Sequence, residues 1–298
     1  MTSGDHCSQP RARQRARLTA LLAAAAALAS LGGLAMSVDA ADPRDAGLLY
    51  DASADAPAPA GWGVEAGNPG PEWASTTERP GRPWMTQRIG RDEGPVLEGS
   101  HAYRMETRGG DEGAYDSDFD CDCERAEFAN GNPTRPGYER RLLREGSDVY
   151  YGFALYLPRE HILGEWQTYF QSKSVAPADL PESALHIERG RWTLGNNDEP
   201  RRRLGVRVIA PATKGVWHRF VIHIRYSSSY GRGRQEVWHA AGPSGPLRKV
   251  VSRRTHTLER GKANHARVGY YHSPLGGRTS YVIVDAFRAG RTYRSVVP

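Results

Sequence analysis

Three short stretches of this sequence carry side chains that can bind an anion or move a proton: "ERAEF", "FQSK" and "RVGYYHS". Neighbouring side chains of a β-strand point to opposite faces, so residues two apart share a face. Arg267 and Tyr271 therefore share one face of the third stretch, and Tyr270 lies on the other. A cation beside a phenol favours the phenolate, so this pair is either an ordinary surface contact or half of an acid–base site.

The other two stretches repeat the pattern. Arg125 and Glu127 alternate with small or apolar residues in the first stretch, and His265 extends the polar face of the third. Around the second stretch we expect one shared face, with Phe170 opposite, made of Gln167, Tyr169, Gln171 and Lys173. A solvated face is the simpler interpretation for any single strand. Three such strands together are more typical of the concave side of a curved sheet.

The segments that must position these residues are typical of an all-β protein. Strand-like runs such as "HAYRMET", "DVYYGFALYLP" and "VWHRFVIHIRY" recur between turn-forming residues. Only "PREHILGEW" predicts a turn or two of helix. About ten strands in one domain predict a β-jelly roll or sandwich of two antiparallel sheets.

The chain begins with a segment that we expect to be a signal peptide, residues 1–41, followed by a single domain over residues 42–298. A basic stretch precedes an alanine-rich apolar run at 18–36, and small residues follow at 38–40. A single membrane anchor is the alternative, because the run is close to spanning length. We favour cleavage, because alanine is only mildly apolar, and expect a secreted or periplasmic protein with no stable membrane insertion.

Net charge and cysteine content say less about the function of the protein than the strand pattern does. The formal net charge is +6, and the predicted signal peptide removes four arginines and two aspartates, which leaves +4. A mildly basic surface suits a polyanion, although solvated charge explains most of it equally well. Cys121 and Cys123 are interpreted as buried thiols or a local bridge.

The order and spacing of these stretches resemble jelly-roll polysaccharide lyases, above all the heparin lyase I-like and glucuronan lyase group and more distantly the alginate lyases. The resemblance covers about residues 46–295 and rests on five segments in order: "ERAEF", "EGSDVYYGFALYLP", "FQSK", "GVWHRFVIHIRYSSSYGRGRQEVWHAAG" and "RVGYY". It implies an enzyme that cleaves an acidic, uronic-acid-containing polysaccharide by β-elimination. We further expect no required cofactor, with structural calcium left open, no nucleic acid partner and a monomer.

The resemblance also implies roles for individual residues. The expected catalytic residues are Tyr271, Arg125, Gln171, Lys173 and Arg267. The expected substrate-binding residues are Glu127, Tyr169, His186 and His265. Arg125 and Gln171 would neutralise the substrate carboxylate, and Tyr271 would act as base or acid.

Two positions depart from the family pattern. Lys173 stands where the family has a histidine, and Arg267 stands where it has a lysine. Arg267 keeps the charge with a different geometry, whereas Lys173 removes an imidazole. His186 is expected to lie near the vacated space, although a lone histidine in a strand is commonly structural.

Two alternatives remain open. Asp120, Asp122 and Glu124 in "DSDFDCDCE" have the spacing of the carboxylates in jelly-roll glycoside hydrolases. The same run could bind structural calcium, and a solvated acidic loop is the simplest interpretation. The other alternative is a non-catalytic module that binds acidic glycans, since the family histidine is missing. No feature of the sequence names the polymer.

Overall fold

The computed structural model describes residues 47–56, 84–111, 123–129, 142–174, 181–195 and 206–298. In these residues fourteen strands form two antiparallel sheets, and no segment is helical. The described residues accordingly contain no helix long and apolar enough to cross a bilayer. The predicted signal peptide and the acidic run before Cys123 lie outside the described residues.

The larger sheet has eight strands in the order β12-β11-β10-β5-β14-β3-β2, with β1 also paired to β14. Their bounds are β1 Leu48–Asp51, β2 Gln87–Gly90, β3 His101–Thr107, β5 Asp148–Tyr156, β10 Trp217–Arg225, β11 Arg234–Ala241, β12 Arg248–Arg254 and β14 Ser280–Gly290.

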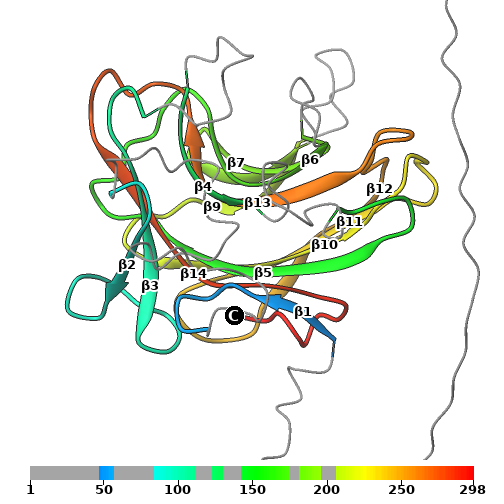
Figure 1. The fold of residues 1–298 in the computed structure, drawn as a ribbon, viewed down its shortest axis with the longest axis horizontal. Helices are drawn as coiled ribbons and strands as arrows, with labels where there is room; N and C mark the ends of the chain where they lie inside the picture. The colour runs from blue at the N-terminus through cyan, green and yellow to red at the C-terminus, as the bar shows by residue number, and fades with distance from the viewer. Residues whose placement is uncertain (1–46, 57–83, 112–122, 130–141, 175–180, 196–205) are drawn as a thin grey trace, which may run out of the picture. The chain divides into compact units, whose positions relative to one another are not determined.

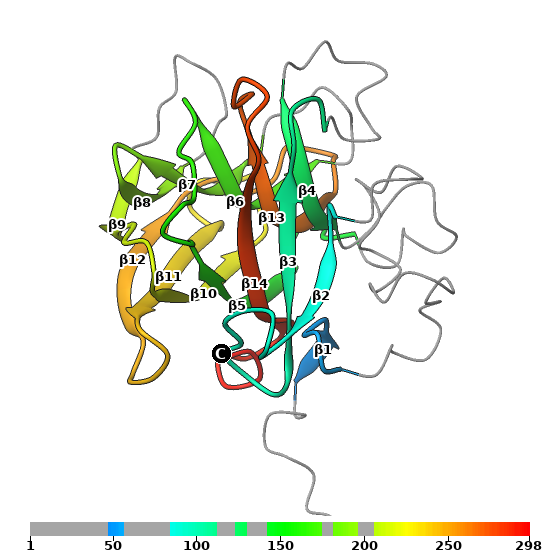
Figure 2. The same ribbon diagram turned by 90° about the vertical axis from the view of Figure 1, so that its left-hand side faces the viewer.

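The smaller sheet has six strands in the order β4-β13-β6-β7-β8-β9. Their bounds are β4 Glu124–Ala129, β6 Gln167–Ser174, β7 Ser183–Glu188, β8 Arg191–Gly195, β9 Arg207–Pro211 and β13 Asn264–His272. The three chemically distinctive stretches of the sequence form β4, β13 and β6, which are direct neighbours. Figure 1 shows the two sheets as stacked layers, and Figure 2 shows β13 beside β6.

Aromatic side chains fill the space between the sheets. Phe153 of β5 stacks on Phe170 of β6 at 5.5 Å between ring centroids, and Tyr103 of β3 meets Phe128 of β4 at 4.7 Å. All four rings belong to one buried core cluster. The inward-facing residues of the six-stranded sheet are therefore fixed by packing, which turns the alternate residues to its outer face.

The predicted β-jelly roll of two antiparallel sheets is confirmed. The run "ALHIERGRWTL" forms two strands, β7 and β8, because Arg189 and Gly190 both adopt positive φ and close a tight turn. The predicted helical turn over "PREHILGEW" is wrong: residues 158–166 are irregular. Side-chain and backbone bonds hold this segment, such as that between His161 Nδ1 and the carbonyl of Tyr281 at 2.8 Å.

Candidate active site

The outer face of the six-stranded sheet brings most of the predicted residues together. We call it the site face and define it by Arg125, Glu127, Thr168, Gln171, Lys173, His186, His265, Arg267 and Tyr271. The residues between them along β4 and β13, such as Phe128 and Val268, lie in the core cluster. Along β4 and β13 the alternation of the sequence thus places the polar side chains on one side of the sheet.

Strand β13 runs through the middle of the site face. Its Tyr271 pairs with Arg125 of β4, and its Gly269 pairs with Glu127. Gly269 has φ +154°, and a Cβ there would lie 2.3 Å from the carbonyl oxygen of Ala126 and 2.6 Å from the Cα of Glu127. Only glycine fits this position. The glycine therefore keeps β4 close to β13, which brings Arg125 next to Tyr271.

Strand β6 contains an irregularity that changes one predicted residue. Its register against β7 shifts between Thr168 and Phe170, so Tyr169 and Phe170 both point into the core. Tyr169 is fully buried, and its ring packs on Trp192 at 4.9 Å. Its hydroxyl donates to Gln167 Oε1 at 2.6 Å. The prediction that Tyr169 shares a face with Gln171 and binds substrate is wrong, because the register shift interrupts the alternation.

Glu127 contacts three other side chains of the site face. It is fully buried, and both its carboxylate oxygens accept hydrogen bonds from Gln171 Nε2, at 2.8 Å and 3.0 Å. Arg125 Nε lies 3.5 Å and Arg267 Nη1 3.7 Å from Glu127 Oε2. This carboxylate is engaged by three neighbouring side chains, so its geometry suits positioning better than direct contact with an anionic substrate.

Tyr271 lies between an arginine and a tryptophan. The guanidinium carbon of Arg125 is 4.0 Å from the centre of the Tyr271 ring, a cation–π distance. The ring of Trp166 meets Tyr271 nearly perpendicularly, with centroids 4.9 Å apart. The half-buried Tyr271 is therefore held in place by its neighbours. A cation does accompany this phenol, and it is contributed by β4.

Arg267 is engaged with a histidine two residues before it. Its Nε donates to His265 Nε2 at 2.9 Å. Since Nε2 accepts, the ring proton of the neutral imidazole is on Nδ1. That buried nitrogen has no hydrogen-bond partner within the described residues. Burial, reinforced by the charges of Arg267, Lys173 and Arg125, holds the pKa of His265 well below its usual value.

His265 lies beside Lys173, the position at which the family pattern has a histidine. The two residues are direct partners across β13 and β6, so an imidazole stands beside the lysine on the same face. His186 is further along the sheet, where its Nδ1 lies 2.9 Å from the hydroxyl oxygen of Thr168. Thr168, paired with Tyr271, joins the site face because of the same register shift that buries Tyr169. A single sequence gives no sign of such a shift.

The acidic alternative receives little support from the described residues. Asp120 and Asp122 lie outside them. Glu124 is buried and lies 3.9 Å from His272 Nδ1, on the face of β4 opposite to Arg125. The part of the chain that is described contains no group of three or more residues suited to a metal ion. Cys123 is disulfide-bonded, which favours the bridge over free thiols, with a partner outside the described residues.

Comparisons with known proteins complete this picture. Among solved structures, the glycoside hydrolase family 131 catalytic domain from Coprinopsis cinerea is similar over 76% of this chain and 84% of its own, with 12% identity and a TM-score of 0.49. Alginate lyase AlgAT5 from polysaccharide lyase family 7 is similar over 63% and 77%, with 13% identity and a TM-score of 0.44. The PL-14 alginate lyase from Aplysia kurodai is similar over 69% and 86%, with 10% identity and a TM-score of 0.43. No match was found among curated proteins.

A family model described as "Polysaccharide lyase" matches residues 65–287. This range covers about three quarters of the sequence and includes β4, β6 and β13 with every residue of the site face. The chain therefore belongs to the polysaccharide lyase family.

Proposed function

We propose that this protein is an exported lyase that cleaves a uronic-acid-containing polysaccharide by β-elimination at the site face. The observation that carries the proposal is the charge of that face. Arg125, Arg267 and Lys173 supply three cations, and Glu127 is the single carboxylate among the residues that define the face. Arg125 and Arg267 are buried at this face and Lys173 is half-buried. A site with this balance of charge suits an anionic polymer better than a neutral one.

The cations suit the first requirement of the reaction. The proton beside a uronate carboxylate is only weakly acidic, and its removal places further negative charge on that carboxylate. Donors fixed in advance stabilise such charge without reorganisation. Glu127 holds Arg125 and Arg267 in place through its ion pairs and accepts hydrogen bonds from Gln171. The Nδ1–H of His265, which has no partner within the described residues, is one further donor. In this account Gln171 orients Glu127 and does not itself bind the carboxylate.

Tyr271 is the group proposed to move the proton. The phenolate oxygen takes the proton from the carbon that bears the carboxylate, and the electron pair forms a double bond to the next carbon. The glycosidic oxygen on that carbon leaves with its bonding electrons and takes up a proton. Tyr271, now protonated, can supply it, so atoms and charge balance without a cofactor. General acid–base groups contribute about 10²–10⁴-fold in rate.

The histidine at position 265 is not proposed as the base. Its Nε2 lone pair already accepts from Arg267, and its lowered pKa opposes taking up a proton. His186, bound to Thr168, is proposed to support the site beside Tyr271.

A panel of polyuronates and glycosaminoglycans tests the proposal. Purified protein should generate the ultraviolet absorbance of an unsaturated uronate with at least one uronate polymer, and none with neutral glucans. New reducing ends without that absorbance would indicate a hydrolase. Binding without either signal would indicate a module that only holds acidic glycans. Size-exclusion chromatography of the same sample tests the expected monomer.

A further inference from the structure

Trp166 is an exposed aromatic residue beside the proposed acid–base group. It is 36% exposed and precedes β6 on an irregular segment. Its perpendicular contact with Tyr271 uses at most one face of the indole. Within the described residues the indole N–H has no hydrogen-bond partner. A large side chain with a free ring face and a free donor thus flanks the reacting centre.

The segment that carries Trp166 is fixed at several points. Ser273 Oγ accepts from the backbone N–H of Glu165 at 3.0 Å and from that of Trp166 at 3.4 Å. The N–H of Ser273 in turn donates to the carbonyl of Trp166 at 3.2 Å. Ser273 directly follows β13, so the backbone of Trp166 is bonded to the end of the strand that carries Tyr271. Little conformational entropy remains to be lost when a ligand binds here.

The position of Trp166 matches the direction of the site face. His265 and Tyr271 are six residues apart, about 20 Å along an extended strand. The pair of His265 and Lys173 marks one end of this row, and Tyr271 with Arg125 marks the other. Trp166 continues the row beyond Tyr271, where a polymer that lies along β13 would place its next sugar.

We propose that Trp166 forms a sugar-binding subsite next to the cleaved bond, where the apolar C–H face of a pyranose ring packs on the indole and the indole N–H donates to a ring substituent. The subsite rests on the proposed function, because its ligand is a unit of the same acidic polysaccharide. Tryptophan is enriched at contacts where one end of the side chain meets an apolar group and the other meets a polar one. A pyranose ring offers both, because its C–H face is apolar and its hydroxyl groups are polar.

The test compares Trp166→Ala with Trp238→Ala. Trp238 lies on β11, paired with Val221 on the outer face of the other sheet, so its loss controls for removing a tryptophan. Both changes are made in a Tyr271→Phe background, and binding of size-fractionated glucuronan and alginate oligosaccharides is measured by calorimetry. We expect Trp166→Ala to weaken binding of the longer oligosaccharides about tenfold, Trp166→Phe to weaken it less, and Trp238→Ala to leave it unchanged. In the protein that keeps Tyr271, Trp166→Ala should raise KM and leave kcat nearly unchanged.

The outcomes separate the two proposals. Wild-type protein that cleaves a uronate polymer while Trp166→Ala binds every length normally overturns the subsite alone. Weaker binding by Trp166→Ala without any unsaturated product from the wild type supports the subsite and overturns the lyase. Absence of binding to both sets of oligosaccharides, together with no unsaturated product from any polymer of the panel, overturns both proposals. Where the wild type cleaves another polymer of the panel, oligosaccharides of that polymer replace the two sets in the binding test. Should Trp166→Ala fail to fold, Trp166→Phe and quenching of tryptophan fluorescence by the same oligosaccharides decide, and unchanged affinity with no quenching overturns the subsite.

Discussion

Gln171 of β6 donates its side-chain amide to both carboxylate oxygens of Glu127 on β4, although β13 lies between the two strands. The intervening strand has no side chain at Gly269, directly opposite Glu127. A buried carboxylate thus joins three strands of the site face. This contact determines what a change at Glu127 should do.

Replacing Glu127 with Gln should lower both stability and activity. The neutral amide no longer balances Arg125 and Arg267, and a buried hydrogen-bonded group is disturbed, so the free energy of unfolding should fall by about 1–3 kcal/mol. Urea denaturation measures the change. Glu188→Gln, at an exposed carboxylate on β7, is the control and should stay within about 0.5 kcal/mol of wild type. Equal stability of the two variants would contradict the role given to Glu127.

Replacing Tyr271 with Phe should lower turnover about a hundredfold or more, because it removes the oxygen that moves the proton. The ring, and hence its contacts with Arg125 and Trp166, is retained, so the affinity for polymer should stay nearly constant. Initial rates on a polymer that the wild type cleaves provide the measurement. Tyr230→Phe, at an exposed tyrosine, should keep full activity. If Tyr271→Phe keeps most of the wild-type rate, Tyr271 only lines the site.

Two replacements of His265 separate its two nitrogens. Asn places an amide nitrogen near the position of Nδ1, whereas Gln places an oxygen near that of Nε2, where Arg267 donates. If the Nδ1–H binds substrate, kcat/KM of His265→Asn should exceed that of His265→Gln by about tenfold, the size of a hydrogen bond to a charged group. The reverse order would show that holding Arg267 is the main task of this histidine.

The fold follows from the strand-like runs between turn-forming residues and from the family resemblance. Half of the site follows from alternation, because β4 and β13 are regular on the side where they pair. Arg125, Glu127, Arg267 and Tyr271 share a face for that reason. The prediction for Tyr169 is wrong because the register of β6 shifts at this point, and a shift depends on which strands are neighbours. Thr168 was missed for the same cause.

Contacts between strands were harder to predict than faces. We expected Arg267 to be the cation beside Tyr271, whereas Arg125 lies over its ring and Arg267 binds His265. Both arginines were on the right face, and pairing between strands decided which one reaches the phenol. Trp166 lies on an irregular segment without any periodicity, so its place beside Tyr271 depends on the bonds to Ser273.

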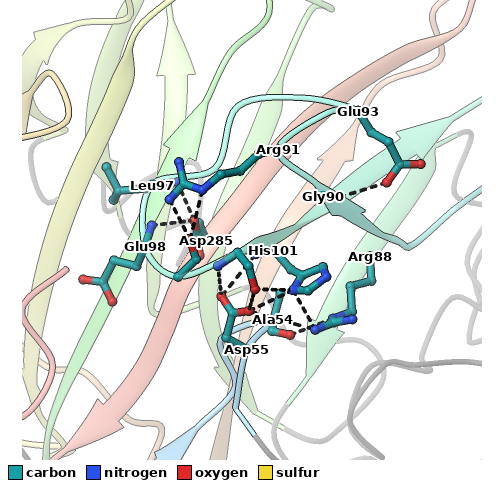
Figure 3. A network of polar contacts seen from close by, with 12 residues as sticks. Ala54, Asp55, Arg88, Gly90, Arg91, Glu93, Leu97, Glu98, His101 and Asp285 are labelled. Atoms are coloured by element: carbon teal, nitrogen blue, oxygen red, sulfur yellow. Dashed lines mark hydrogen bonds and ion pairs between the residues drawn. The ribbon is translucent and has the colours of Figure 1, made fainter.

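Asp285 should make stability depend on pH. Burial raises its pKa to about 6, even though the backbone N–H groups of Glu98, Leu97 and Ala286 act in the opposite sense. The carboxylate of Asp285 accepts hydrogen bonds from the backbone N–H groups of Leu97 and Glu98, which lie in the loop between β2 and β3 (Figure 3). Because the folded pKa lies above the unfolded value, this contribution is complete below about pH 4 and declines as pH rises through about 6.

Asp285→Asn should remove that decline, which is on the order of 2–3 kcal/mol. Urea denaturation at several pH values between about 4 and 7 measures it. Asp55 provides a control of opposite sign: burial raises its pKa, but hydrogen bonds from His101 and Ser100 outweigh this and lower it to about 2. Asp55→Asn should therefore alter stability above about pH 4 and spare the decline between pH 4 and 6. An unchanged slope in Asp285→Asn would contradict the assignment.

The chemistry of bond cleavage tests the central claim most directly. Products of a cleaved uronate polymer are collected in isotopically labelled water and analysed by mass spectrometry. β-Elimination breaks the bond without adding water, so each cleavage should leave one unsaturated uronate at the new non-reducing end and an ordinary reducing end on the other fragment. Neither end should carry more labelled oxygen than the slow exchange at reducing ends that the same oligosaccharides show without enzyme. One labelled oxygen per cleaved bond, with saturated ends, would identify a hydrolase and contradict the account.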